Sequence, residues 1–357
     1  MTATAVNLCP ARLEPIFSPR PWGALSLAPL FPEKSNLTEP LGEAWMTGNE
    51  SRFASGPFAG EKLGNVWPKL PPQWAGTQAD LAHDFPLLVK FIFAEQKLSV
   101  QVHPDDEFAK RHESSAGAGA SGKTEMWYAL RAREGAEVLV GLKLGVTAEK
   151  FKRAIVDGTA EDCLEHVPMR AGDAIFVPAG TAHTIGGGLV LCEIQQHSDI
   201  TYRVYDYNRR DAQGKPRDLH IEKALQVIQF GEQSGGKIDP VRISRGPVTE
   251  TYFVACRYFA TEKWEFAERI ASTTSPEHFD LLIFLEGHGS IQWGNESVDY
   301  APAQTWLVPA ALGAYQLNPA ARTTLLRTYV PTHIDELARK LADQGVSESA
   351  WSRLVYP

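Results

Sequence analysis

Two side chains that can bind a metal ion lie two residues apart in the segment LSVQVHPDD. If this segment is a β-strand, Gln101 and His103 project from the same face, because successive side chains of a strand alternate between its faces. The opposite face carries the apolar residues Val100 and Val102. We therefore predict that the polar face is turned toward a pocket, the reverse of an ordinary half-buried strand.

Two further candidate ligands lie later in the chain. Glu125 begins the strand-like run EMWYAL, and His183 follows a tight turn in VPAGTAHTIG. Two imidazoles, one carboxylate and one amide oxygen suit Zn²⁺, or alternatively Mn²⁺ or Fe²⁺, with positions left open for water or substrate. We predict one such ion per chain, bound by Gln101, His103, Glu125 and His183.

A spacing pattern adds weight to His183. The segment reads Gly172-x5-Pro178-x-Gly180-x2-His183, which matches every spacing of the second metal-site motif of the cupin superfamily. A lone strand histidine is more often an ordinary core or surface residue. The combination, and no single residue, predicts a metal site.

Short strands are expected to position these residues. The stretch from Phe85 to Val102 is rich in β-branched and aromatic residues and predicts two strands broken near Glu95 to Lys97. Further strands are predicted at residues 125–130, 137–142, 174–177 and 189–195.

Three helices are predicted from capping residues and apolar spacing. Thr147 is expected to cap a helix carrying Phe151 and Ile155, and Thr159 to cap residues 160–166. Asp218 is expected to cap a helix with Ile221, Leu225 and Ile228 on one face.

The loop GEQSGGK at residues 231–237 is the predicted domain boundary. Beyond it, a strand-rich region runs from about Arg242 to Val330, and Thr332 with Asp335 resembles a capping box at the start of a final helix. We predict a catalytic domain over residues 1–230 and a second, metal-free domain over residues 231–357.

An internal similarity links the two regions. Residues 171–183, AGDAIFVPAGTAH, align without a gap on residues 302–314, PAQTWLVPAALGA. The alignment replaces His183 by Ala314 and Gly172 by Ala303. It indicates a duplicated β-unit whose second copy keeps the strand and turn but loses the ligand.

Composition limits the function classes. A net charge of −8 and a pI near 5.7 argue against nucleic-acid binding, which needs a clustered basic face. No apolar run approaches about 18 residues, and no signal-like N-terminus is present, so a cytoplasmic protein without membrane partners is expected. The four scattered cysteines lack CxxC pairing and are expected to be reduced and structural.

Several motifs together resemble the type I mannose-6-phosphate isomerases, most closely their shorter bacterial members. They are LSVQVHPDD, GKTEMWYAL, the turn ending in His183, CEIQQHSDITYRVYDYNR, RPWG, GEAW and LHIEKAL. The resemblance covers residues 10–230 well and the remainder loosely. It implies a mainly β fold of two cupin (jelly-roll-like) barrels with a few peripheral helices.

The resemblance also implies roles for individual residues. It gives a zinc ion held by the four ligands named above, Arg203 as the catalytic arginine, and Lys123 and Glu193 as further pocket residues in catalysis. It places Lys90 and Ser99 beside the substrate, the serine near its phosphate, with Arg209 a further source of phosphate-binding charge.

One departure from the longer family members is Gly122, which stands where they carry a histidine before the lysine. The chain also lacks room for their large helical insertion. The run DYNRRD is expected to be a polar loop in which Asp206 and Asp211 have no special role.

The resemblance implies conversion of mannose 6-phosphate to fructose 6-phosphate through an enediolate, by a monomer or homodimer acting on a small sugar phosphate. The alternatives are a non-catalytic cupin that binds a metal or sugar, or another cupin enzyme, either a different sugar-phosphate isomerase or an iron-dependent oxygenase. Gln101 argues against the oxygenase, because such enzymes typically use two histidines and one carboxylate.

Overall fold

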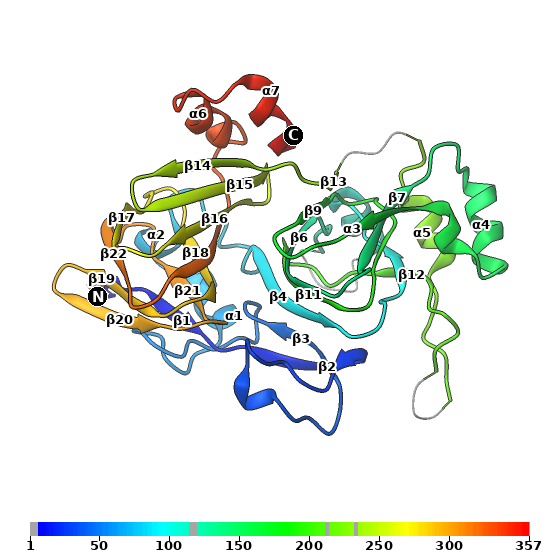
Figure 1. Ribbon diagram of the computed structural model, residues 1–357, viewed down its shortest axis with the longest axis horizontal. Helices are drawn as coiled ribbons and strands as arrows, with labels where there is room; N and C mark the ends of the chain where they lie inside the picture. Colours follow the sequence, from blue (N-terminus) through cyan, green and yellow to red (C-terminus); the bar gives the residue numbers. More distant parts are fainter. Residues whose placement is uncertain (1–5, 114–119, 211–213, 232–234, 357) are drawn as a thin grey trace. The chain divides into compact units, whose positions relative to one another are not determined.

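The computed structural model describes residues 6–113, 120–210, 214–231 and 235–356. The chain is mainly β, as predicted, and forms two compact units (Figure 1). Unit 1 comprises Met1–Ile16, Trp45–Leu87 and Asp239–Pro357, and unit 2 comprises Phe17–Ala44 and Leu88–Ile238.

The two units are not divided at a single point of the chain. Strand β1 (Ala11–Leu13) pairs with β21 (Thr305–Val308), so an N-terminal segment that we placed in the first domain belongs to the sheet of the C-terminal region. Of the predicted boundary loop, residues 232–234 lie outside the described residues, and Gly236–Lys237 forms β13 of unit 2. The division into a catalytic domain and a metal-free domain stays a prediction.

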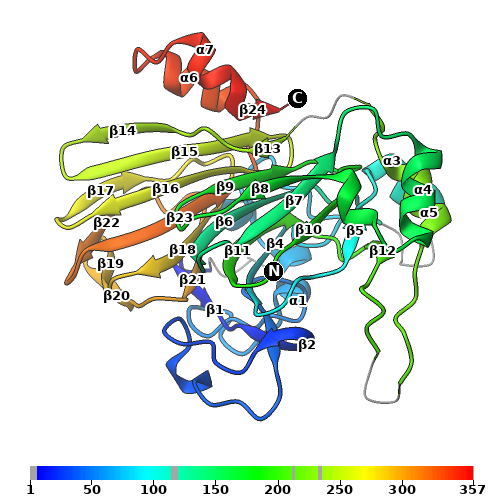
Figure 2. The same cartoon turned by 45° about the vertical axis from the view of Figure 1, so that its right-hand side comes forward.

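Unit 2 contains two sheets. The seven-stranded sheet has the order β13-β9-β6-β11-β4-β3-β2, part of which can be followed in Figure 2. Its strands, besides β13, are β2 (Ile16–Ala24), β3 (Leu41–Trp45), β4 (Leu87–Ala94), β6 (Glu125–Ala132), β9 (Ala174–Val177) and β11 (Leu189–Gln196). The five-stranded sheet, in the order β12-β5-β10-β7-β8, consists of β5 (Val100–Val102), β7 (Glu137–Leu142), β8 (Leu164–Pro168), β10 (His183–Ile185) and β12 (Tyr202–Tyr205).

The core of unit 2 lies between these sheets. One buried cluster takes Trp127 and Ala129 from β6 together with Val138 of β7 and Ile185 of β10. Because side chains two apart share a face, Glu125 on β6 and His183 on β10 point into the same inter-sheet space. The strands therefore direct candidate ligands inward, as the sequence predicted.

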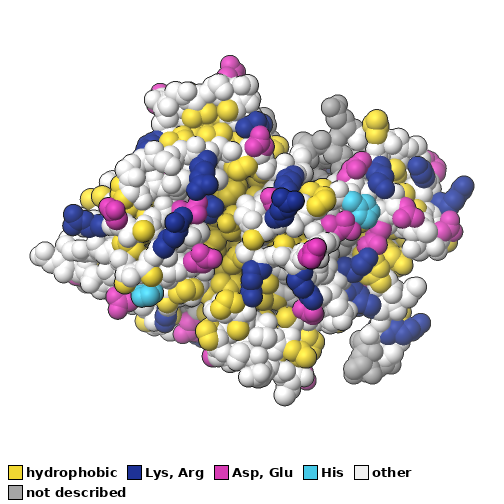
Figure 3. Space-filling view, viewed as in Figure 1, with side chains coloured by type: hydrophobic (Ala, Val, Ile, Leu, Met, Phe, Trp, Pro, Cys, Tyr) yellow, Lys and Arg dark blue, Asp and Glu magenta, His cyan; other side chains and the backbone are white. Residues whose placement is uncertain are grey.

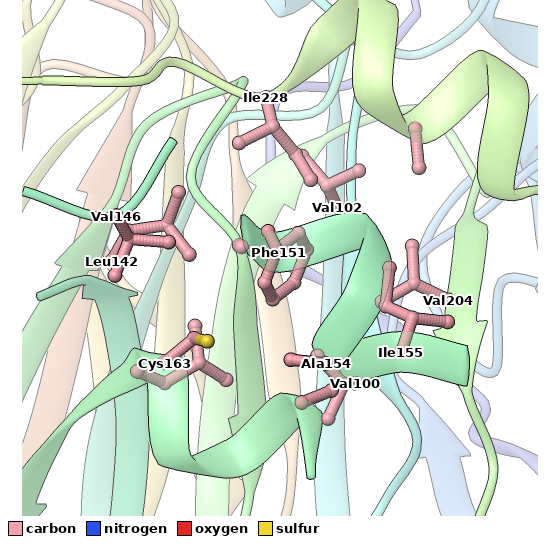
Figure 4. Packing of buried hydrophobic residues seen from close by; sticks show 14 of the residues in the cluster. Val100, Val102, Leu142, Val146, Phe151, Ala154, Ile155, Cys163, Val204 and Ile228 are labelled. Atoms are coloured by element: carbon pink, nitrogen blue, oxygen red, sulfur yellow. The ribbon is translucent and has the colours of Figure 1, made fainter. Parts of the chain in front are cut away.

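A second cluster covers the outer face of the five-stranded sheet. Val100 and Val102 pack there with Phe151 and Ile155 of α4 (Ala148–Val156) (Figure 4). The prediction that the valines of this strand face away from Gln101 is thus confirmed. Helix α4 begins as predicted, because the Thr147 side chain accepts a hydrogen bond from the backbone N–H of Lys150.

The other predicted caps are wrong. Residues 160–163 form the short 3-10 helix η4, Thr159 makes no capping hydrogen bond, and Leu164 already starts β8. Helix α5 (Ile221–Val227) begins after His220 instead of Asp218. These segments are tied by strand pairing and by backbone hydrogen bonds, which override the local capping preference.

Unit 1 also contains two sheets. The eight-stranded sheet comprises β1, β14 (Val241–Arg245), β15 (Val248–Cys256), β16 (Ala260–Phe266), β18 (Asp280–Glu286), β21, β23 (Thr323–Tyr329) and β24 (Val355–Tyr356). The four-stranded sheet comprises β17 (Ile270–Thr273), β19 (Gly289–Trp293), β20 (Glu296–Tyr300) and β22 (Ala314–Pro319). One apolar cluster, which includes Trp264, Leu282 and Leu317, draws on both sheets.

The remaining helices are short. They are α1 (Leu63–Val66), α2 (Pro72–Ala75), α3 (Asp106–His112), α6 (Glu336–Ala342) and α7 (Glu348–Trp351), with 3-10 turns η1 (Pro32–Lys34), η2 (Trp67–Lys69) and η5 (Ser352–Leu354). The predicted capping box before α6 is wrong, because Asp335 is the N-cap residue and makes no side-chain capping bond. No helix in the described ranges is both long enough and apolar enough to cross a membrane. All four cysteines are free and buried, as expected.

The internal similarity read from the sequence has a structural counterpart. The aligned segments place β9 on β21, and the first residues of β10 and β22 coincide at His183 and Ala314. Gly172 has φ 92°, and Ala303, its counterpart, keeps a left-handed φ of 58°. A non-glycine residue in this left-handed region of backbone conformation is strained, so the second turn keeps the same geometry although alanine stands in place of glycine.

Strand register extends the correspondence to charged residues. Glu125 lies opposite Val177, and Asp280 lies opposite Val308. Two residues further along each strand, Trp127 faces Glu193, whereas Leu282 faces Arg327. Unit 1 therefore has a carboxylate, Asp280, at the position of Glu125. At the position of the negative Glu193 it has the positive Arg327.

This reversal gives unit 1 a self-contained group of buried charges. Arg327 donates to Glu262 at 2.7 Å and to Asp280 at 2.8 Å. Helix α6 adds Lys340, 3.1 Å from Glu262. Arg327 and Lys340 hold the pKa of Glu262 below its usual value despite burial, so the group is ionised and paired.

On the face drawn in Figure 3, positive and negative side chains are interspersed in each unit. This distribution agrees with the acidic net charge. It gives no support to a nucleic-acid partner on the face shown.

Replacing Arg327 by Met should destabilise the protein by about 3–5 kcal/mol, because two buried carboxylates would lose the guanidinium that they share and keep only Lys340 and His278 beside them. Urea unfolding of the full chain would measure the change. Arg242→Met is the matched control, since Arg242 pairs with Glu265 on the surface and its loss should matter by less than about 1 kcal/mol. Equal shifts for the two variants would contradict the analysis.

Helix α6 should be held in a pH-dependent way through His278. Burial lowers the pKa of His278, but the neighbouring Asp280 and Glu336 outweigh it and raise the pKa to about 9. Because this exceeds an unfolded pKa of about 6.5, the stabilisation is complete below that pH and is lost as pH rises through the folded value. His278→Gln should therefore lower the urea midpoint at pH 6 and have little effect near pH 10. An equal difference in urea midpoint at both pH values would refute this role of the contact between His278 and Glu336 of α6.

Candidate metal centre and active site

Three buried side chains of unit 2 bring their ligand atoms within 4.8 Å of one another. They are His103, Glu125 and His183, and each is no more than 1 % exposed. His103 follows β5, Glu125 begins β6, and His183 begins β10 directly opposite Gln101. The sequence prediction brought these same residues together.

Each histidine is oriented by a backbone carbonyl. Nδ1 of His103 lies 2.8 Å from the oxygen of Ile200, and Nδ1 of His183 lies 2.8 Å from the oxygen of Thr181. These bonds require a proton on Nδ1 and leave Nε2 as the free ligand atom. Nε2 of His103 and of His183 lies 3.8 and 3.4 Å from the Glu125 carboxylate.

Burial keeps both imidazoles neutral. It lowers the pKa of His183 to about 4 and that of His103 well below its usual value, with Lys123 adding to the second effect. A neutral imidazole is the form that binds a metal ion. Both histidines are therefore ready ligands near neutral pH.

Gln101 completes the group. Its Nε2 lies 3.3 Å from Nε2 of His183, and its Oε1 is 3.4 Å from the Ser99 hydroxyl. A half-turn of the amide exchanges the two atoms and would direct the oxygen to the histidine side. The amide is thus placed to act as the fourth ligand.

The Glu125 carboxylate gives the test of whether a cation fits. It is fully buried, and neither oxygen accepts a well-aligned hydrogen bond from the part of the chain that the structure describes. The ammonium of Lys123 lies 2.6 Å from Oε2 and 3.4 Å from Nε2 of His103. Positive charge is therefore stabilised here, and the two imidazoles, carboxylate and amide fit a divalent ion.

A second layer of charge surrounds these ligands. Lys123 lies 3.6 Å and Lys90 lies 3.7 Å from Oε1 of Glu193, whose other oxygen accepts a hydrogen bond from Trp127. Burial opposes the charged form of Lys123, but the Glu125 and Glu193 carboxylates outweigh it and raise its pKa. Burial raises the pKa of Glu193, against the opposing effect of Lys123.

Arg203 reaches the ligand group from β12, where it lies opposite Gln101. Its Nε donates to the Ser99 hydroxyl at 3.2 Å, and its Nη1 donates to the carbonyl of Asp218 at 3.1 Å. Ser99 therefore links the guanidinium to Gln101. The predicted Lys90, Ser99, Lys123, Glu193 and Arg203 all lie in one network with the metal-binding residues.

Known proteins resemble this chain in sequence and in fold. The mannose-6-phosphate isomerase ManA of Bacillus subtilis is 34% identical over 315 residues, covering 87% of this chain and 96% of the relative. The chain belongs to the mannose-6-phosphate isomerase family. A Streptococcus mutans mannose-6-phosphate isomerase is 32% identical over 285 residues, covering 79% of this chain and 86% of its own length.

The family assignment extends to both parts of the chain. Residues 11–137 match the phosphomannose isomerase type I catalytic domain, and residues 249–330 match the mannose-6-phosphate isomerase cupin domain. The crystal structure of the mannose 6-phosphate isomerase from Bacillus subtilis superposes with a TM-score of 0.81 at 31% identity, over 89% of this chain and 99% of that one. A zinc-bound mannose 6-phosphate isomerase shares the fold with a TM-score of 0.71 at 17% identity, over 90% of this chain and 99% of that one.

In this family member, Arg209 is held by the buried carboxylate of Asp206, which follows β12 and its Arg203. Arg209 and Arg217 both pair with the Asp206 carboxylate, and Arg209 also donates to the carbonyl of Lys97 at 2.7 Å. Burial lowers the pKa of Arg203, and the positive charges of Arg217 and Arg209 add to the effect, so the three guanidinium groups act on one another.

The expectation that Asp206 has no special role is wrong. Its side chain is 5 % exposed and holds two arginines, whereas Asp211 lies outside the described residues. The spacing of Asp206 and Arg209 was visible in the sequence. The second partner, Arg217, was not, because the antiparallel bridge between Arg210 and Pro216 brings it beside the carboxylate.

Asp199 is a further charged residue beside this network that the sequence analysis missed. Its carboxylate lies 3.3 Å from Lys90, and Lys90 and Lys123 outweigh burial to lower its pKa. Only its position just after β11, in the run that also carries Glu193 and Arg203, could have indicated it.

The surroundings of Gly122 explain why this chain has no histidine here, unlike the longer isomerases. A Cβ at this position would lie 2.5 Å from the backbone carbon of Asp105, and the Gly122 N–H donates to the Asp106 carboxylate at 2.8 Å. A histidine cannot be placed here without moving that backbone. The proton chemistry of this chain must therefore be done without it.

Removing a ligand should empty the metal site. We expect Gln101→Ala, His103→Ala, Glu125→Gln and His183→Ala each to lose most of the bound metal in elemental analysis, because the remaining donors are too few for tight binding. His166→Ala is the control, since this histidine is exposed and pairs with Glu137. Full metal content in the four variants would exclude this ligand set.

Proposed function

We propose that this chain interconverts mannose 6-phosphate and fructose 6-phosphate, using a zinc ion held by Gln101, His103, Glu125 and His183. The observation that carries the proposal is the buried three-residue donor group in direct contact with Lys123. Neutral histidines with one carboxylate and one amide favour zinc, and manganese or iron could take the same place.

The reaction moves a proton between C1 and C2 of the sugar, and negative charge develops on the oxygens of an enediolate. When bound, zinc would supply Lewis-acid stabilisation of that charge, and a ligand set with one carboxylate leaves much of its own charge uncompensated. The residues around it must orient the sugar, exclude water and move the proton.

Lys123 and Glu193 are placed to handle the proton. The two side chains lie 3.6 Å apart and are almost fully buried. Burial makes the Glu193 carboxylate a stronger base than an exposed one, and the charged Lys123 can donate to a developing oxyanion. We assign proton acceptance at carbon to Glu193 and stabilisation of the neighbouring oxygen to Lys123.

Arg203 and its neighbours are suited to the charged parts of the substrate. A guanidinium is always protonated, so Arg203 would stabilise the enediolate or orient the sugar and would not act as a base. Lys90, Ser99 and Arg209 would bind or position the phosphorylated sugar, with phosphate contacts from Ser99 and Arg209. Arg203 donates to Ser99, and the positive charges of Arg217 and Arg209 act on Arg203, which favours a phosphate at that end.

We further propose that the strand units are two cupin barrels, that the protein is cytoplasmic and that it works as a monomer or homodimer. The sheets and core clusters of each unit support the barrels. A small sugar phosphate is the expected partner.

A coupled assay tests the function. Purified protein should form fructose 6-phosphate from mannose 6-phosphate, lose this activity with a chelator and regain it with Zn²⁺. Arg203→Ala should lower kcat by about 100- to 1,000-fold while the metal content is retained, because the enzyme loses a positive charge that stabilises the transition state. Arg153→Ala, an exposed change on α4, should leave kcat unchanged.

The alternatives give different results in the same assay. A non-catalytic cupin would bind mannose 6-phosphate in calorimetry without forming product. Another sugar-phosphate isomerase would turn over a different sugar phosphate faster. Normal kcat in Arg203→Ala would remove this residue from the reaction.

A further inference from the structure

Two motifs of the chain, RPWG and GEAW, have no place in the proposed chemistry. They form parts of β2 and β3, which are neighbours at one edge of the seven-stranded sheet. Across these strands, Nε and Nη2 of Arg20 donate to the two oxygens of Glu43 at 3.1 and 2.8 Å. This is a bidentate pair, the strongest form of such an interaction.

The glycines of the two motifs press the strands together. A Cβ on Gly42 would lie 2.5 Å from Cβ of Arg20 and 2.6 Å from the Trp22 ring. A Cβ on Gly23 would lie 2.4 Å from the backbone carbon of Leu41. Trp22 is itself buried in the core cluster that contains Trp127. The Arg20–Glu43 pair is thus held by close packing and not by a flexible surface contact.

The four adjacent strands β11, β4, β3 and β2 each carry a charged residue, and the sign of the charge alternates in that strand order. In this order the residues, which we call the charge row, are Glu193, Lys90, Glu43 and Arg20. Lys90 lies 3.7 Å from Glu193 at one end, and Arg20 holds Glu43 at the other. Glu43 is 8 % exposed, so its charge is weakly screened by solvent.

The electrostatic effect of the pair reaches the pocket. Burial is the largest cause of the raised pKa of Glu193, and the negative charge of Glu43 adds a smaller effect in the same direction. Burial opposes the lowered pKa of Asp199, which comes mainly from Lys90 and Lys123, with a smaller effect from Arg20. Lys90 lies on the strand between Glu43 and Glu193 and pairs with both Glu193 and Asp199. Any uncompensated charge on Glu43 would therefore compete with those two carboxylates for the Lys90 ammonium.

We propose that Arg20 is a positioning residue for the isomerisation, which fixes and neutralises Glu43 so that Lys90 keeps its place beside Glu193 and Asp199. This inference rests on the proposed function. It assigns a task to the RPWG and GEAW motifs: they build the outer end of a charge row whose inner end lies in the pocket.

A double-mutant cycle tests the proposal. Arg20→Gln should lower kcat/KM for mannose 6-phosphate by about 10- to 100-fold, as expected when a pocket group is displaced. Metal content should stay near that of the wild type, and the urea midpoint should fall less than in Arg327→Met, because the Arg20 side chain is 31 % exposed. Arg20→Gln combined with Glu43→Gln removes both charges and should recover most of the loss in kcat/KM, whereas a merely structural role would change the urea midpoint and leave kcat/KM of both variants near the wild type.

Two further variants sharpen the outcome. Arg20→Lys keeps the positive charge but cannot bond both oxygens of Glu43 in the same way. Its kcat/KM should lie between those of the wild type and Arg20→Gln. Arg133→Gln is the matched control, because Arg133 makes an exposed ion pair with Glu95 in the same unit, and its kcat/KM should not change. An additive or larger loss in the double variant overturns the proposal.

Crystal structures separate this inference from the proposed function. If the wild type shows no isomerase activity, the function fails, but the position of Lys90 can still be compared between wild type and Arg20→Gln. The inference requires the Lys90 ammonium to move from Glu193 toward Glu43 in the variant. An unchanged Lys90 would overturn it.

Discussion

The burial of one carboxylate determines the design of unit 2. Glu125 is fully buried between two imidazoles that burial keeps neutral, so only a cation can compensate it. The Lys123 ammonium provides part of that compensation, and a divalent ion would provide the rest. The backbone carbonyls that orient His103 and His183 matter for the same reason, because they leave both free ring nitrogens directed at the carboxylate.

The surrounding residues extend this charge balance outward. Lys123 and Lys90 lie between carboxylates, and Glu193 lies between the two lysines. Each ionised group is therefore flanked by groups of opposite sign, and a displaced member changes the balance of its neighbours. This dependence explains why the edge strands β2 and β3, which hold no proposed ligand, can influence the pocket. It also explains why the site is built on strands, whose side chains have fixed spacing and direction.

The sequence could predict features that depend on local spacing. The alternation of Val100, Gln101 and Val102 predicted which side chains turn inward, and the cap at Thr147 was found because threonine and helix are adjacent in the chain. Features that depend on distant partners were not predictable. Asp206 looked like a loop residue because its partner Arg217 is brought beside it only by the bridge between Arg210 and Pro216. Asp218 and Thr159 looked like caps, although backbone hydrogen bonds place the helix and strand starts elsewhere. Asp199 has no meaning without Lys90, which lies on another strand.

The corresponding positions in unit 1 indicate what it would take to build a metal site there. The position of the lost histidine, Ala314, is exposed, and the retained carboxylate at Asp280 is already neutralised by Arg327. Restoring the imidazole by a single substitution would place it at an exposed position, and Asp280 already has Arg327 as its cationic partner. The buried charges of unit 1 thus stabilise one another. Building a metal site there would require replacing Arg327, whose ion pairs with Glu262 and Asp280 support the fold.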